Sequence, residues 1–161
     1  MNFKPIIIVA GEPNSIFFEI FFKVIKKNIK SPIILIASKK VIIQQAKILK
    51  SRINLNIINQ SEIFNKKKKL KKINLIDVDF EQVSGFNRIT SKSNKYISTC
   101  FDIAIKLLKY NVSNKFINGP ISKKNFLKKK FNGITEYLAN KTNTKNFAMI
   151  IYNKNLSVCP L

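Results

Sequence analysis

Short apolar runs and segments with helical periodicity alternate along the first part of the chain. Residues 5–10 and 32–37 are continuous runs rich in isoleucine, a pattern typical of strands buried on both faces of a parallel sheet. Between these runs, Ser15 is a candidate N-cap for a helix. The helix has two adjacent apolar stripes, formed by Phe18, Phe22 and Ile25 and by Phe17, Phe21 and Val24. We therefore expect this helix to be sandwiched between other elements.

The alternation of strands and helices continues to residue 78. Apolar residues at helical spacing predict a helix over 39–51, and apolar runs predict strands over 55–58 and 73–78. The lysine-rich segment 66–72 lies between these two strands and is predicted to be a solvated loop with room for one helical turn. Residues 80–91 show no periodicity and contain turn-forming glycine and asparagine, which indicates a surface loop.

The clearest amphipathic helix begins after Lys92. Its apolar face recurs at intervals of three and four residues, at Ile97, Cys100, Phe101, Ala104, Leu107 and Leu108. Polar residues occupy the opposite face, so one side of this helix is expected to cover the core.

The last third of the chain repeats the order of strand and helix. Residues 115–118 predict a short strand, and residues 122–127, which begin with a serine suited to capping, predict a helix. A further helix is expected over 135–140, and two strands over 147–152 and 156–159. The whole pattern predicts an α/β fold, with a mainly parallel sheet and flanking helices.

Length and composition fit a globular protein. The chain has 161 residues, of which 45% are hydrophobic, enough to bury one sizeable core. No apolar stretch approaches the roughly 20 residues that cross a bilayer, and the first residues do not resemble a secretory leader. We therefore expect a cytoplasmic protein with no membrane partner. Cys100 and Cys159 lack metal-binding spacing and the chain has no histidine, so both are expected to be buried thiols.

The net charge of +22, from 30 basic and 8 acidic residues, raises the possibility of a nucleic-acid partner. Almost all of the excess is lysine, however, and Arg52 and Arg88 are the only arginines. Base and phosphate recognition favours the bidentate guanidinium group of arginine. The abundance of Lys, Asn, Ile and Phe is better explained by drift in an AT-rich coding sequence. We therefore expect no nucleic-acid partner.

Three turns are candidates for chemistry, because ligands of open α/β sheets bind beyond the carboxyl ends of the strands. The turn at 11–15 lacks both the P-loop sequence and the glycines of a dinucleotide fingerprint. In the turn at 118–123, Lys123 stands at the start of a helix, where an anion would offset its charge, although a solvated lysine fits equally well. In the turn at 133–136, Thr135 could donate its hydroxyl to a ligand, although ordinary helix capping also explains the sequence.

Together these segments resemble the motifs of a known family. They read Gly11-Glu-Pro-Asn-Ser-Ile16 followed by Glu19-Ile20, Asn118-Gly-Pro-Ile-Ser-Lys123, and Gly133-Ile-Thr-Glu-Tyr-Leu-Ala139. In this order and spacing they are similar to the signature segments of 4-hydroxythreonine-4-phosphate dehydrogenases, and the resemblance extends over nearly the whole chain.

The resemblance implies a fold like that of isocitrate and isopropylmalate dehydrogenases, with two α/β parts, an active site in the cleft between them, and a homodimer. Residues 1–161 would form the N-terminal part, and the C-terminal part is absent from this sequence. It also implies an NAD-dependent oxidoreductase of vitamin B6 (pyridoxal phosphate) biosynthesis. Such enzymes oxidise and decarboxylate 4-phosphohydroxy-L-threonine to 3-amino-2-oxopropyl phosphate, assisted by a divalent metal (Zn, Mg or Co) that histidines bind.

The resemblance also assigns substrate contacts. Lys123 and Thr135 match substrate-binding positions, whereas Ile134 takes the place of a substrate-contacting histidine and can neither titrate nor form a side-chain hydrogen bond. No residue could be assigned to catalysis or to cofactor binding.

The family's metal-binding histidines belong to a segment that would follow Leu161. We therefore expect these residues alone to bind neither the metal nor NAD tightly and to be inactive by themselves. Two alternatives remain: a degenerate, non-catalytic paralogue, and, less favoured, a basic nucleic-acid-binding module.

Overall fold

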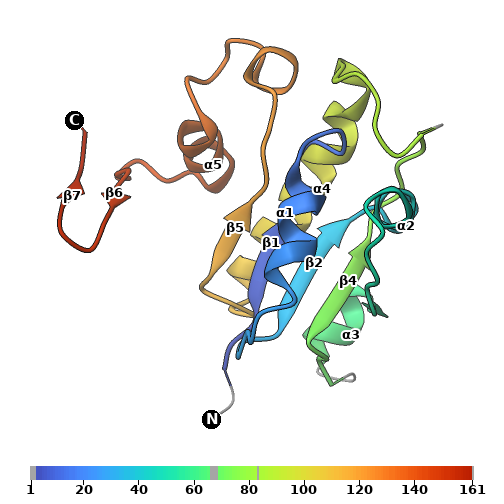
Figure 1. Cartoon of the computed structure of the whole chain (residues 1–161). Coiled ribbons are helices and arrows are strands. Elements are labelled where there is room, and N and C mark those ends of the chain that lie inside the picture. Colours follow the sequence, from blue (N-terminus) through green and yellow to red (C-terminus); the bar gives the residue numbers. More distant parts are fainter. Residues whose placement is uncertain (1–2, 66–68, 83, 161) are drawn as a thin grey trace. The chain divides into compact units, whose positions relative to one another are not determined.

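The computed structural model describes residues 3–65, 69–82 and 84–160. The chain divides into two compact units at the bond between Ser122 and Lys123. The first unit contains a parallel five-stranded sheet in the order β3-β4-β2-β1-β5 (Figure 1). Its strands are β1 (Ile6–Val9), β2 (Ile33–Ala37), β3 (Asn56–Ile57), β4 (Ile73–Asp77) and β5 (Phe116–Asn118). The prediction of an α/β fold with a mainly parallel sheet is therefore confirmed.

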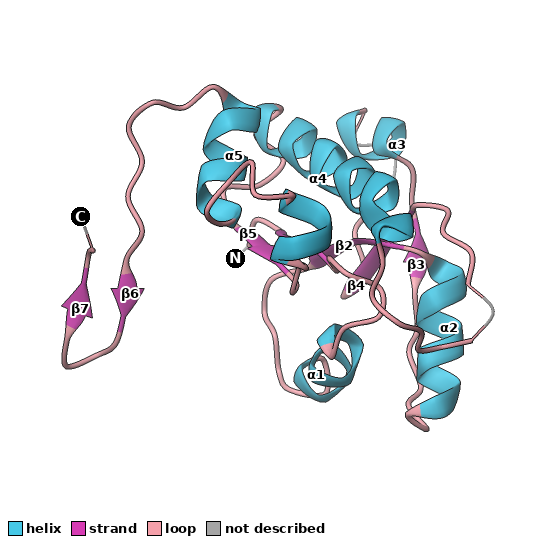
Figure 2. Ribbon diagram, turned by 90° about the horizontal axis from the view of Figure 1, so that it is seen from above, coloured by secondary structure: helices cyan, strands magenta, loops and turns pink. Residues whose placement is uncertain are grey.

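Helices cover both faces of this sheet, which is why its strands β1 and β2 are apolar throughout. Helices α1 (Phe17–Val24) and α2 (Lys39–Ile48) lie on one face, and α3 (Gln60–Phe64) and α4 (Asn94–Lys109) on the other (Figure 2). All five residues of β2 are buried. A strand with two covered faces has no position where a polar side chain would reach water, so a continuous apolar run is favoured.

One cluster of the core lies between the sheet and helices α1 and α2. Strand register places Ile8, Leu35 and Leu75 side by side across three strands, and this row packs against the phenylalanines of α1. On the opposite face, α4 packs against β1 and β2. The buried side chains of α4 are Tyr96, Ile97, Cys100, Phe101, Ala104, Ile105 and Leu107. The predicted face of this helix is confirmed, with Leu108 half-buried at its margin.

The prediction that α1 is sandwiched is wrong. Phe18, Phe21 and Phe22 are buried, but Ile20 and Val24 are 49% and 42% exposed, so the helix covers the sheet with one face only. The rings instead pack along the helix: Phe17 stacks on Phe21 with centroids 5.5 Å apart. The aromatic residues of the second apolar stripe thus pack against neighbouring rings of the same helix.

Several predicted boundaries shift in the structure. Helix α1 begins at Phe17, with Ile16 rather than Ser15 as its N-cap, although Ser15 Oγ accepts a hydrogen bond from the Phe17 N–H at 3.3 Å. The single helical turn expected in the lysine-rich segment occurs earlier, as α3. Of that segment, residues 66–68 lie outside the described part of the chain.

The second unit begins with a π-helical turn, Lys123–Leu127, and continues with helix α5 (Ile134–Thr142). An aromatic cluster links these segments, because the ring of Tyr137 lies 5.2 Å from that of Phe126 and 5.6 Å from that of Phe131. The helices predicted over 122–127 and 135–140 are therefore both present, the first with π rather than α geometry.

The end of the chain forms a small antiparallel hairpin of β6 (Ile151–Tyr152) and β7 (Ser157–Val158). The strands predicted over 147–152 and 156–159 are thus present but much shorter. Cys159, expected to be buried, is exposed. The prediction was wrong because it took an apolar run as a sign of burial, whereas each strand of this hairpin pairs through only two residues.

Cys100 is buried on α4 as predicted, and its surroundings suppress thiolate formation. Burial raises the pKa of its thiol to about 12, although a hydrogen bond with Tyr96 acts in the opposite direction. Tyr96 also accepts a hydrogen bond from the Ser38 N–H at 3.0 Å, which ties α4 to the start of α2. None of the described helices is long and apolar enough to span a bilayer.

Replacement of Leu35 by alanine should destabilise the first unit by about 2–5 kcal/mol, because the side chain is fully buried at the centre of the sheet. Urea unfolding followed by circular dichroism measures the change. Ile43→Ala on α2 is the control, since Ile43 is 54% exposed and its loss should cost about 0.5 kcal/mol or less. Equal losses for the two variants would contradict the proposed core.

The two cysteines should differ sharply in reactivity, because the thiolate is the reacting form. Since the Cys100 thiol stays protonated until the pH approaches its raised pKa of about 12, it should resist alkylation at neutral pH. Cys159 should react much faster, because its side chain is exposed. Mass spectrometry of peptides after timed iodoacetamide labelling measures both rates, and rapid labelling of Cys100 in the folded protein would contradict this assignment.

Candidate functional site

The turns after β1 and β5 lie in contact, because these two strands are neighbours in the sheet. Because Val9 pairs with Asn118, the segments that follow β1 and β5 leave the sheet side by side, at the carboxyl ends of these strands. The N–H of Gly119 donates to the Val9 carbonyl at 2.7 Å, and the N–H of Glu12 donates to the Pro120 carbonyl at 2.8 Å. Two of the three turns chosen from the sequence are therefore brought together, at the edge where open α/β sheets bind ligands.

Close approach of these turns explains both of their glycines. Gly11 has a φ of +77°, and a Cβ added there would lie 2.4 Å from the Pro120 carbonyl oxygen. A Cβ on Gly119 would lie still closer to the backbone carbonyl of Ala10. Backbone atoms cannot move aside as a flexible side chain can, so larger residues would force the two turns apart.

The side chain of Glu12 points inward, although a carboxylate is costly to bury without partners. Glu12 is only 2% exposed. One carboxylate oxygen accepts a hydrogen bond from Ser93 Oγ at 2.7 Å, and the other accepts from the backbone N–H of Asn14 at 3.3 Å. Ser93 stands at the end of a short 3₁₀ turn, Ser91–Ser93, directly before α4. Glu12 thereby ties the first turn to the start of that helix.

Further polar contacts connect the first turn to the loop that follows β4. The backbone N–H of Asn87 donates to Asn14 Oδ1 at 2.7 Å. The amide nitrogen of Gln45 on α2 donates to two carbonyls, those of Pro13 at 2.6 Å and Gly85 at 2.5 Å. The 11–15 turn is therefore held from three elements that are distant in sequence.

Ser93, Gln45 and Asn87 were not predicted from the sequence. Two of them carried a usable signal. Ser93 directly precedes a strongly amphipathic helix, where capping residues are common. Gln45 is a polar residue on the apolar stripe of its helix, three positions after Ile42. Asn87 donates through its backbone, so its side-chain type gave no indication of the contact.

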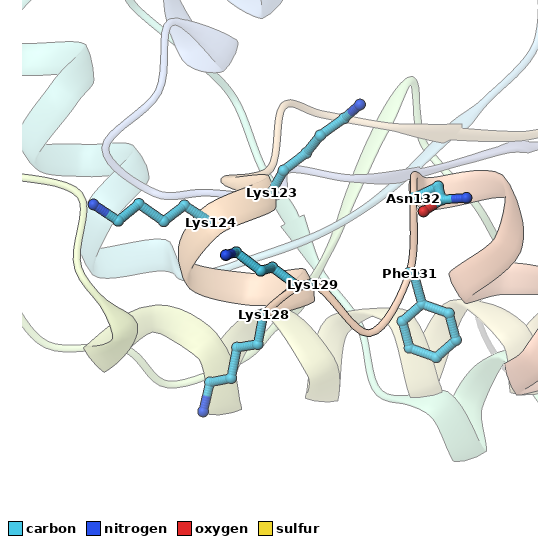
Figure 3. A pocket seen from close by; sticks show the side chains of 6 residues that line it. All are labelled: Lys123, Lys124, Lys128, Lys129, Phe131 and Asn132. Atoms are coloured by element: carbon cyan, nitrogen blue, oxygen red, sulfur yellow. The ribbon is translucent and has the colours of Figure 1, made fainter.

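The remaining predicted site residues, Lys123, Ile134 and Thr135, belong to the second unit. Lys123 lines a hollow of about 520 Å³ together with Lys124, Lys128, Lys129, Phe131 and Asn132. The four lysine side chains point in different directions, so their ammonium groups do not converge on one position (Figure 3). The hollow is basic, but its lysines are not arranged as a closed cage for an anion.

Ile134 and Thr135 are the first two residues of α5, and both are half-buried. Gly133, the N-cap, gives this helix no side-chain cap. The carboxylate of Glu136 folds back toward the cap: one of its oxygens lies 3.0 Å from where a Cβ of Gly133 would stand. The Thr-Glu pair therefore stands at a helix start, as its sequence indicated.

The described residues do not fit the divalent metal that the resemblance implies. No three of their His, Cys, Asp or Glu side chains lie together so as to hold an ion, and the full sequence has no histidine. No step that requires this metal can be assigned to these residues.

Substitution of Gly11 by alanine should destabilise the first unit by about 2–4 kcal/mol, because alanine disfavours the left-handed backbone and its Cβ meets the Pro120 carbonyl. Gly133→Ala is a matched control. Its φ of −158° suits any residue, and the nearest atom is the mobile end of Glu136, so the cost should be about 1 kcal/mol or less. Urea unfolding measures both changes. A Gly11→Ala variant as stable as the parent would refute the turn contact.

Comparisons with known proteins agree with the fold and the motifs. The model of the family described as pyridoxal phosphate biosynthetic protein PdxA matches residues 28–161, a range that includes the second and third motif segments. No curated protein has a significantly matching sequence.

Solved structures share the fold. A 4-hydroxythreonine-4-phosphate dehydrogenase from Klebsiella pneumoniae is 22% identical, with a TM-score of 0.81 over 98% of this chain and 50% of its own. An enzyme of the same name from Burkholderia phymatum is 16% identical, with a TM-score of 0.79 over 97% of this chain and 48% of its own. This chain thus spans about half the length of these relatives. On the strength of the family match, it belongs to the PdxA family of pyridoxal phosphate biosynthetic proteins.

Proposed function

We propose that this chain supplies the substrate-side part of an NAD- and metal-dependent 4-hydroxythreonine-4-phosphate dehydrogenase in vitamin B6 biosynthesis. The observation that carries the proposal is the family match over residues 28–161. The contact between the Gly11 and Gly119 turns supports it, since these two motif segments follow the carboxyl ends of neighbouring parallel strands, where open α/β sheets in general bind ligands.

In this proposal residues 1–161 correspond to the N-terminal part of a two-part, homodimeric enzyme of the cytoplasm. Half of each relative's chain has no counterpart in this sequence. That half would supply the metal-binding histidines and most of the NAD-binding surface, because the described residues contain no fitting set of ligands. Neither a nucleic acid nor a membrane is a partner.

The proposed substrate is 4-phosphohydroxy-L-threonine. Its hydroxyl-bearing carbon would transfer a hydride to NAD, and the resulting β-keto acid would lose carbon dioxide to leave 3-amino-2-oxopropyl phosphate. Lys123 would attract the phosphorylated substrate through its charge, and Thr135 would donate its hydroxyl. Ile134 would offer only an apolar contact where relatives are expected to have a histidine, so binding would be weaker.

A non-catalytic paralogue is the second candidate, and the observation that favours it is Ile134. Loss of a polar substrate contact fits a protein that keeps the fold without the chemistry. Measurement of NADH formation by the full-length protein with 4-phosphohydroxy-L-threonine, NAD and a divalent metal separates the two. Turnover supports the enzyme, and its absence from a folded protein supports the paralogue.

In the full-length protein, Lys123→Ala and Thr135→Ala should each raise KM for the phosphorylated substrate about tenfold or more, since hydrogen bonds to charged groups contribute about 1.5–3 kcal/mol. Ile134→His should leave KM unchanged or lower it. Lys26→Ala, which removes an exposed lysine from the first unit, is the control for loss of charge. Unchanged kinetics in both alanine variants would remove these residues from the site.

A further inference from the structure

Gln45 is a fully buried polar side chain on a helix that otherwise presents apolar residues to the core. It is 0% exposed and lies on α2 beside Ile42 and Ala46. Burial of an amide is costly unless its hydrogen-bonding groups are matched. An aliphatic residue would suit the core better, so the amide must be explained by what it contacts.

Both contacts of Gln45 are made by its amide nitrogen, and both acceptors are backbone carbonyls in loops. One is Pro13, within the 11–15 turn, and the other is Gly85, in the loop after β4. The amide oxygen has no hydrogen-bond partner among the described residues. Gln45 therefore acts as a double donor that joins two loops to α2.

The two joined loops also contact each other at a second point. The backbone N–H of Asn87 donates to Asn14 Oδ1, and Asn14 in turn donates its own N–H to Glu12. Gln45 holds this pair of loops from the buried side, whereas Asn14 joins them nearer the surface. Such a double attachment restricts the backbone of the turn at Pro13, two residues after Gly11.

The neighbouring Gln44 provides a contrast. Its amide nitrogen donates to the Gln82 carbonyl at 3.1 Å, so it also holds the loop after β4. No hydrogen bond connects its side chain to the 11–15 turn in the described structure. Gln44 thus contacts only the loop after β4, whereas Gln45 contacts both that loop and the 11–15 turn.

We propose that Gln45 is a positioning residue of the substrate site, which fixes the 11–15 turn against Gly119 and Pro120 by binding the carbonyls of Pro13 and Gly85. The proposal rests on the proposed function, in which that turn and the turn after β5 lie where open α/β sheets bind ligands. Gln45 touches no reacting atom. It acts by limiting the conformations that the turn samples before substrate binds, which lowers the entropic cost of binding.

The test compares Gln45→Met with Gln44→Met in the full-length protein. Methionine keeps the length and much of the volume of glutamine but cannot donate a hydrogen bond. Amide hydrogen exchange is measured over residues 11–16 and, as an internal reference, over β2. Steady-state kinetics give KM and kcat separately.

We expect Gln45→Met to accelerate exchange over 11–16 at least tenfold without accelerating exchange in β2, and to raise KM about tenfold with little change in kcat. Gln44→Met should leave exchange over 11–16 and KM as in the parent. Equal exchange over 11–16 in parent and Gln45→Met would overturn the proposal, as would acceleration that extends equally to β2, because the role would then be general stability.

If Gln45→Met does not fold, Gln45→Leu, which also lacks the amide donor, replaces it in the same comparison and should accelerate exchange over 11–16, whereas an unchanged rate would overturn the proposal. The exchange measurements need no substrate. A full-length protein without dehydrogenase activity would therefore refute the proposed function while still deciding whether Gln45 holds the turn.

Discussion

The parallel pairing of β1 with β5 is the constraint on which the candidate site in the first unit depends. These strands are separated by more than a hundred residues of sequence, and only their register brings Val9 opposite Asn118. Once they pair, the backbones leaving them meet at one edge of the sheet, where a side chain on either glycine would collide with backbone. The pairing therefore dictates the glycines, the inward turn of Glu12, and the need for partners such as Ser93 that offset the burial of its carboxylate.

Much of the fold could be predicted because its signal is local. A strand covered on both faces is apolar at nearly every position, so β1 and β2 were recognisable from unbroken apolar runs, β4 from a run that Asn74 interrupts, and α4 from its periodicity. Prediction failed where burial depends on what lies beside an element. The second apolar stripe of α1 and the apolar hairpin around β6 look like core in sequence, yet Val24 and Tyr152 are exposed.

The candidate site was only half predictable for a related reason. Glycines in turns after strands are visible in the sequence, since few other residues tolerate a left-handed backbone or close backbone contact. The contacts that hold those turns are harder to predict, because Asn87 donates through its own backbone N–H and Gln45 binds backbone carbonyls, which any sequence provides. Gln45 binds Pro13 and Gly85 through such carbonyls, so no pairing of side-chain types reveals the contact. The contact of Gln45 with these two loops became visible only in the structure.

The choice between an enzyme and a non-catalytic paralogue depends on Ile134. The free energy of the substrate contact that a histidine would make there helps to decide it. Loss of one hydrogen bond to a charged ligand costs about 1.5–3 kcal/mol, roughly ten- to a hundredfold in affinity. Helix α5 begins at Ile134, and the adjacent Thr135 provides a hydroxyl at the same helix start. In the proposed enzyme, an isoleucine at this position would weaken substrate binding and leave the Thr135 hydroxyl in place. A loss of this size would lower the substrate affinity without by itself abolishing the chemistry.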